Sequence, residues 1–155
     1  MIASFFGKAG HLSISVLVER RTVNAEWYIT TALPGRFAAV CQRRPQSGMR
    51  DLQLHHDNAP AHTAAATLDF LADNGVRLVS HPPYSPDLAP CDFFLFPKLK
   101  LQMRGRRFES PIAAVTAYRD LLEGLEKDDY IKCFEDWFVR MAKCVHCLGD
   151  YFEKK

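Results

Sequence analysis

The chain of 155 residues has the length of one globular domain. Hydrophobic residues make up 48% of it and charged residues 25%, a balance that excludes a disordered chain, a collagen-like repeat and a small disulfide-stapled scaffold. The net charge of +2 permits a nucleic-acid partner without requiring one.

The cysteines, five in number, are dispersed, and residues 1–18 lack the pattern of a signal peptide. Both features indicate a reducing, intracellular compartment. Pro, Gly or charged residues interrupt every apolar run, so no stretch approaches the roughly 18 apolar residues of a membrane span. We therefore expect a soluble protein with no membrane partner.

The first part of the chain predicts a hairpin and a helix. Apolar residues alternate over 1–6 and 11–18, on either side of a glycine-containing turn. Asn24 is a suitable N-cap for a helix that ends near Cys41, although Pro34 and the following glycine should kink or interrupt it.

A strand, helix, strand order follows. Residues 51–57 predict a strand, 61–74 a helix that Gly75 ends, and 76–80 a second strand. A right-handed unit of this kind makes its two strands parallel. We expect an α/β fold in which this parallel pair and the hairpin form one mixed sheet flanked by helices.

The remainder is expected to be helical after a proline-rich structured loop over residues 81–97. No repeat or linker divides the chain, so residues 1–155 are treated as one domain. The expected helices run from after Asp92 toward Met103 with Gly105 closing the first, from Ser110 to about Leu125, and from Tyr130 to Leu148 with Gly149 ending the last.

Two aspartates are the first candidates for chemistry. Asp57 follows a predicted buried strand, and Asp92 follows the loop that begins where the next strand ends. Ligands bind at this edge of a sheet with parallel strands. Taken singly, each residue has a structural alternative, because aspartates in loops usually cap turns or helices.

Together with their surroundings, the two aspartates resemble a known family. Residues 55–64 (HHDNAPAHTA) and 81–96 (HPPYSPDLAPCDFFLF) are similar to the catalytic domain of mariner-type transposases, and 34 residues lie between Asp57 and Asp92, as in the family's acidic triad. Residues 107–110 and the end of the chain, at 137, 143–145 and 149–153, extend the likeness over nearly the whole length.

The resemblance implies an RNase H-like fold in which three acidic side chains hold two Mg²⁺ or Mn²⁺ ions. Such ions prefer carboxylate oxygens, and a two-metal site stabilises both the attacking and the leaving oxygen in phosphodiester cleavage. By this resemblance, Asp57 and Asp92 are the second and third members of the triad.

The first member of the triad has no counterpart, because in the family it lies on a strand that precedes the hairpin. We therefore expect a catalytic domain without its first strand and without the helix-turn-helix module that recognises transposon ends. Glu26 is a weak candidate for a substitute ligand, and a solvated glutamate in a first helical turn is the simpler interpretation. The chain alone is expected not to cleave DNA.

Two segments suggest macromolecular contacts. The family's motif at Tyr84, Ser85, Pro86, Asp87 and Leu88 is implicated in dimer contacts, and its alternative is a rigid turn with a helix cap. A basic run after Asp92 would contact DNA phosphates without reading sequence, unless it is only a solvated face. The residues of this run are Lys98, Lys100, Arg104, Arg106 and Arg107.

The cysteines and histidines give weaker indications of a metal site than the two aspartates do. Cys144 and Cys147 lack a second pair at zinc-ligand spacing, so no zinc is expected. The histidines near Asp57 are expected to be ordinary hydrogen-bonding residues, although one of the first two could contact DNA phosphate; they are His55, His56, His62 and His81.

The resemblance thus implies a nuclear DNA transposase catalytic domain that is expected to be inactive alone. Its ancestral reaction would cleave and join strands at transposon ends, with a TA target. Its partners would be DNA and either a second copy of the chain or an intact transposase subunit. The alternatives are a non-catalytic DNA-binding or dimerisation module and a non-functional remnant of a mariner element.

Overall fold

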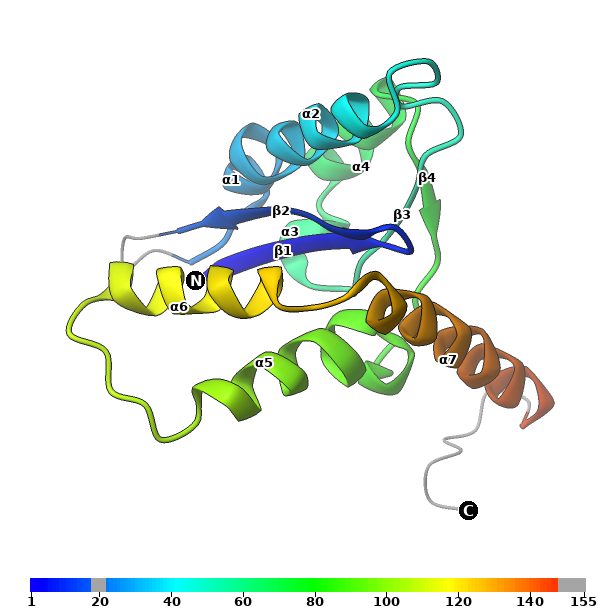
Figure 1. Ribbon diagram of the computed structural model, residues 1–155. Coiled ribbons are helices and arrows are strands. Elements are labelled where there is room, and N and C mark those ends of the chain that lie inside the picture. The colour runs from blue at the N-terminus through cyan, green and yellow to red at the C-terminus, as the bar shows by residue number, and fades with distance from the viewer. Residues whose placement is uncertain (18–21, 148–155) are drawn as a thin grey trace. The chain divides into compact units, whose positions relative to one another are not determined.

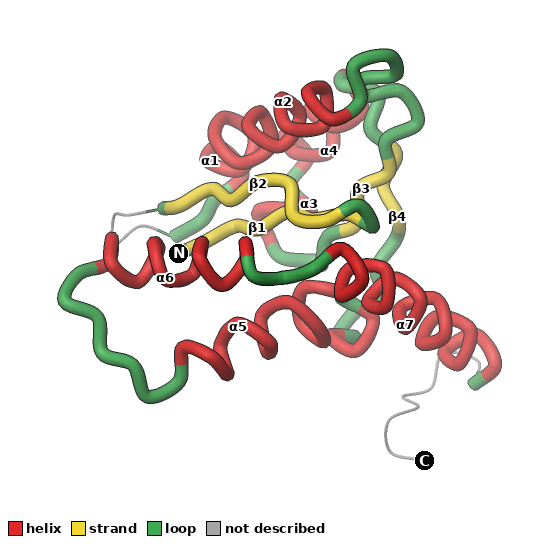
Figure 2. Tube along the Cα trace, viewed as in Figure 1, coloured by secondary structure: helices red, strands yellow, loops and turns green. Residues whose placement is uncertain are grey.

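The computed structural model describes residues 1–17 and 22–147, which form two compact units. The first unit comprises residues 1–6 and 11–83, and the second comprises 7–10 and the chain from Tyr84 onward. Figure 1 and Figure 2 show the elements. Before Tyr84 these are β1 (Ile2–Gly7), β2 (Gly10–Val16), α1 (Ala25–Trp27), the π-helical η1 (Tyr28–Ala32), α2 (Leu33–Arg43), β3 (Gln53–His55), α3 (Pro60–Thr63), α4 (Ala65–Asp73) and β4 (Arg77–Val79).

The predicted hairpin is confirmed in the described residues. Strands β1 and β2 pair with each other across a tight turn, and Gly10 adopts φ 121°, a backbone conformation that glycine tolerates without a Cβ clash. The Leu17 N–H donates to the Met1 carbonyl over 2.8 Å, which extends the pairing to the strand ends. The predicted end of the hairpin at residues 18–21 lies outside the described residues.

The helix predicted from Asn24 is also confirmed, and it continues to Arg43. The Asn24 side chain accepts from the Trp27 N–H over 2.9 Å, which satisfies one of the free donors at the helix start. The expected disturbance at Pro34 takes the form of the wider η1 turn rather than a break. A proline has no N–H for the α-helical bond, and a π turn is one way to accommodate that loss.

The strand, helix, strand unit has the predicted parallel pairing with shorter elements. Leu54 of β3 pairs with Leu78 of β4, and each strand has three residues. The single helix expected over 61–74 is two helices, because Ala64 adopts an extended ψ of 140° between α3 and α4. Gly75 ends α4 as expected, with φ 65°.

The expectation of one mixed sheet is wrong for the described residues. They contain two two-stranded sheets, β1–β2 and β3–β4. The alternation that predicts a strand does not specify its neighbour, because pairing depends on contacts far along the chain. What holds is the coarser description of a mixed α/β fold with small sheets and several helices.

A single hydrophobic core holds the first unit together. Its most buried members come from η1, α2 and α4, and the rings of Phe37 and Phe70 stack at 5.9 Å where α2 and α4 lie side by side (Figure 1). The buried residues of this core are Phe5, Tyr28, Ala32, Leu33, Phe37, Val40, Leu52, Leu54, Leu71 and Val76.

The second unit is helical in its described part. Its elements are the 3₁₀ turn η2 (Pro86–Leu88), the π-helical η3 (Cys91–Leu95), α5 (Phe96–Met103), α6 (Pro111–Glu123) and α7 (Lys127–His146). Ser110 caps α6 as predicted, since its hydroxyl accepts from the Ala113 N–H over 3.1 Å. Helices α5 and α6 pack side by side.

Helix α7 has the predicted helical spacing of apolar residues, but not all of the apolar face expected to be buried is buried. Tyr130 and Trp137 are buried, whereas Val145, expected on the same face, is 76% exposed. The last turns of this helix lack a neighbour for that face in the described residues. The predicted end at Gly149 lies outside the described residues.

No helix in the described ranges is long and apolar enough to cross a bilayer.

Candidate metal and nucleic-acid site

Asp57 lies two residues after β3, where the chain turns toward α3. Its Oδ1 accepts from the Ala59 N–H over 3.1 Å, so the aspartate does form the turn that the structural alternative predicts. The side chain is nevertheless 48% exposed. A turn-forming carboxylate that faces solvent can also serve as a ligand, so the two interpretations are compatible.

His62 is the second donor to Asp57. Its Nδ1 lies 2.7 Å from Asp57 Oδ1 and 3.2 Å from the Asp57 carbonyl oxygen. Both oxygens only accept, so Nδ1 must carry the proton. The hydrogen bond from His62 lowers the pKa of Asp57 to about 2, and the Ala59 N–H acts in the same direction while burial opposes it. Asp57 is therefore a carboxylate at neutral pH.

The other histidines of this region form contacts with one another. His55 Nε2 and His81 Nδ1 are 3.1 Å apart, and His56 Nδ1 lies 3.3 Å from the Tyr28 hydroxyl. Burial, with a smaller contribution from neighbouring histidines, lowers the pKa of both His55 and His56 to about 4. These two rings are neutral near pH 7, which agrees with the predicted hydrogen-bonding role.

Asp92 lies in the first turn of η3, in the second unit, and is exposed. The N-cap of η3 is Pro90, with no capping side chain, so the alternative in which Asp92 caps this helix is not what the structure shows.

These donors suit a hard divalent cation. Asp57 is ionised and half exposed, and carboxylate oxygen is the ligand that Mg²⁺ and Mn²⁺ prefer. Within the described ranges, no three His, Cys, Asp or Glu side chains are arranged to hold a metal ion. Glu26 is exposed in the first turn of α1. None of the five cysteines forms a disulfide, and burial raises the pKa of Cys133 to about 12.

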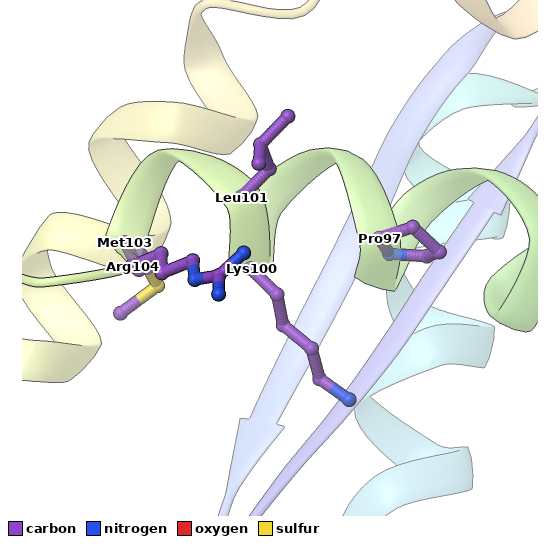
Figure 3. Close-up of a pocket in the computed structure, with 5 residues that line it drawn as sticks. All are labelled: Pro97, Lys100, Leu101, Met103 and Arg104. Carbon is purple, nitrogen blue, oxygen red and sulfur yellow. The ribbon is translucent and has the colours of Figure 1, made fainter.

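The basic run divides into one paired residue and four exposed ones. Lys98 donates to Asp129 of α7 over 2.6 Å, and this contact lowers the pKa of the Asp129 carboxyl. Lys100 and Arg104 line a pocket on α5 with Pro97, Leu101 and Met103 (Figure 3). The exposed cations are Lys100, Arg104, Arg106 and Arg107.

The segment predicted to make dimer contacts is partly buried within its own unit. Asp87 and Leu88 are 6% and 4% exposed, and Arg140 of α7 donates to the Asp87 carbonyl over 3.3 Å. Tyr84 is fully exposed and adopts φ 53°, a strained value for a tyrosine. Only the beginning of the motif therefore offers side chains to another molecule.

Sequence reasoning did not identify the His62 contact to Asp57. The signal was the five-residue spacing across Pro60, which starts α3 and turns the histidine back toward the strand end. A fixed spacing around a loop does not reveal this geometry until the loop conformation is known.

The chain is 38% identical over 100 residues to the human histone-lysine N-methyltransferase SETMAR and 29% identical over 155 residues to the Mariner Mos1 transposase of Drosophila mauritiana. These matches span 64% and 99% of this chain but only 15% and 45% of the two relatives. No family model matches the chain.

Solved structures give the stronger match. The catalytic domain of Mos1 mariner transposase superposes with a TM-score of 0.91 at 30% identity, covering 98% of this chain and 75% of that one. A structure of the same domain with raltegravir and Mn gives a TM-score of 0.90 with 76% of that chain covered. The Mos1 paired-end complex with Mn also gives 0.90, with 44% of that chain covered.

Proposed function

Since this chain belongs to the mariner transposase family, we propose that it provides the Asp57 and Asp92 carboxylates of a catalytic domain that cuts and joins DNA strands. The observation that carries the proposal is the ionised carboxylate at Asp57, held by His62 and the Ala59 N–H at the end of a parallel strand. The Mos1 structures with Mn and Mg support the choice of cation.

The chemistry requires a strong nucleophile and a stabilised leaving oxygen, which two divalent ions supply when bound. In this chain, Asp57 would be an oxygen ligand whose charge is present at neutral pH because its pKa is about 2. Asp92 would be the second ligand, exposed on η3. This assignment requires the two carboxylates to share one metal site.

DNA is the proposed substrate. Mos1 forms paired-end complexes with transposon ends, and the exposed cations of this chain on and after α5 suit the DNA backbone. By the same family argument we propose transposon ends with a TA target, a nuclear location, and assembly with a second copy or an intact transposase subunit.

We also propose that the third carboxylate comes from outside these 155 residues, so that the chain alone does not cleave. Among the described residues, no group of three His, Cys, Asp or Glu side chains could hold a metal ion. A further strand could unite the β1–β2 and β3–β4 pairs into one RNase H-like sheet, because strand edges present backbone donors and acceptors that favour pairing. That strand would carry the missing residue.

The test is cleavage of a duplex containing a transposon end, in Mn²⁺. This chain is compared with a version that carries an added N-terminal strand with an aspartate, and both are compared with their Asp57→Asn and Asp92→Asn variants. We expect nicking only by the extended protein, lost in either variant. Equal, Asp57-dependent nicking by the unextended chain would contradict the need for an added strand and make Glu26 the next residue to replace.

A second function, DNA binding without catalysis, is favoured by one observation. The exposed cations lie on α5 and the loop after it. An extended protein that binds the duplex but fails to nick it under any metal condition would support this second function.

A further inference from the structure

The Asp57 carboxylate is held through one of its two oxygens. The Ala59 N–H and the His62 Nδ1–H both donate to Oδ1, over 3.1 and 2.7 Å. Among the described residues, none donates a hydrogen bond to Oδ2. A carboxylate that is half exposed would otherwise rotate freely, so two donors on one oxygen define which oxygen remains for a ligand.

The His62 ring is itself held by two neighbouring rings. The Tyr28 ring lies 4.6 Å from it between centroids, and the His56 ring stacks on it at 4.6 Å with an interplanar angle of 5°. Tyr28 is 2% exposed and belongs to the core of the first unit, where it also stacks with Phe5. The orientation of Nδ1 is thereby tied to the packed interior rather than to a loop.

We propose that His62 is a positioning residue for the metal-dependent reaction: its Nδ1–H holds Oδ1 of Asp57 and so presents Oδ2 to a divalent cation. This inference rests on the proposed function, since it assumes that Asp57 is a metal ligand. Hydrogen bonds from outer residues orient carboxylate ligands in metal sites, and losing one typically weakens metal binding by about 10- to 100-fold.

The competing explanation is that His62 only packs against Tyr28 and His56. Two substitutions separate these roles. His62→Phe keeps a flat ring for stacking but has no donor, whereas His62→Asn loses most of the ring but places an amide N–H near the position of Nδ1. His146→Phe is the matched control, because His146 is an exposed histidine near the end of α7 in the second unit.

The first measurement is Mn²⁺ binding by electron paramagnetic resonance, with the full chain. We expect His62→Phe to weaken binding about tenfold, and His62→Asn and His146→Phe to stay within about threefold of the wild type. Asp57→Asn should abolish the same binding. If His62→Phe binds Mn²⁺ as well as the wild type while Asp57→Asn does not bind it, the positioning role is overturned and the proposed function stays intact.

The second measurement needs no metal. Long-range ¹H–¹⁵N spectra report which ring nitrogen of His62 carries the proton. We expect a proton on Nδ1 in the wild type and a redistribution toward Nε2 in Asp57→Ala, which removes both acceptor oxygens of the side chain. A bare Nδ1 in the wild type would overturn the inference. If the wild type binds no Mn²⁺ without the third carboxylate, the same binding measurement on the extended protein tests the proposed metal function, and this spectrum still decides whether His62 holds the carboxylate.

Discussion

The basic run on and after α5 allows the DNA-binding proposal to be tested residue by residue. Lys98 is paired with Asp129 at 2.6 Å, whereas the other four cations are exposed. We expect replacement of those four by alanine to weaken binding to a duplex and Lys98→Ala to leave it almost unchanged. The four are Lys100, Arg104, Arg106 and Arg107.

The magnitude follows from counterion release. Each phosphate contact contributes a slope of about −0.9 to the dependence of log K on log salt. If all four exposed cations contact phosphates, their loss makes the slope shallower by about 3 to 4. Between 50 and 200 mM salt, the contacts of these four residues correspond to about a 100-fold loss of affinity. The wild type should show this loss, and the variant with all four residues replaced by alanine should not.

Fluorescence anisotropy of a labelled duplex of about 20 base pairs, titrated at several KCl concentrations, gives these slopes. Circular dichroism and urea unfolding check that each variant folds. Lys98→Ala should change the free energy of unfolding by about 0–1 kcal/mol, the usual value of an exposed ion pair, with its salt slope unchanged.

Two results would refute the assignment. An unchanged slope in the fourfold variant would show that the exposed cations are only a solvated face, which is the alternative drawn from the sequence. A slope reduced by about 0.9 in Lys98→Ala would show that the pair with Asp129 opens to bind phosphate. The first outcome removes the exposed cations from the DNA contact, and the second adds Lys98 to it.

Two further predictions concern the acidic residues. Fe²⁺-generated radicals should cut the chain near both Asp57 and Asp92, and Asp57→Asn should abolish both cuts; cutting near Asp92 that survives this change would argue against a shared site. Because the pKa of Asp57 is about 2 rather than 3.8, its carboxylate stabilises the folded chain above about pH 4, and this contribution is lost as the pH falls toward 2. With the side chain 48% exposed, solvent screening limits this contribution to about 1 kcal/mol. The difference in unfolding free energy between the wild type and Asp57→Asn, measured by urea unfolding, should therefore shrink to zero over that pH range. A difference that stays constant with pH would contradict the assignment to Asp57.

The structural features that the sequence predicts correctly each depend on a few neighbouring residues. Asn24 and Ser110 cap their helices, and Gly75 and Gly105 adopt positive φ where helices end. Capping and left-handed turns are decided within three or four positions of the chain. The hairpin at the start of the chain belongs to the same class, because alternation and a tight turn specify it locally.

The site was predicted in its residues but not in its contacts. The family motif placed Asp57 after a strand, and the sequence contained no reason to connect it with His62 rather than with another histidine. The same is true of Lys98, whose partner Asp129 lies 31 positions away. A charge pattern does not reveal such a partner, so from sequence alone the five cations of the run are equivalent.

Tertiary structure decided the features that depend on distant segments. It divided the predicted mixed sheet into two strand pairs, widened the helix before Pro34 into a π turn, and interrupted the next helix at Ala64. It also left Val145 exposed on a face that periodicity marks as buried. Local propensity sets which segments become strands and helices, whereas pairing, register and burial follow from which surfaces meet when the chain packs.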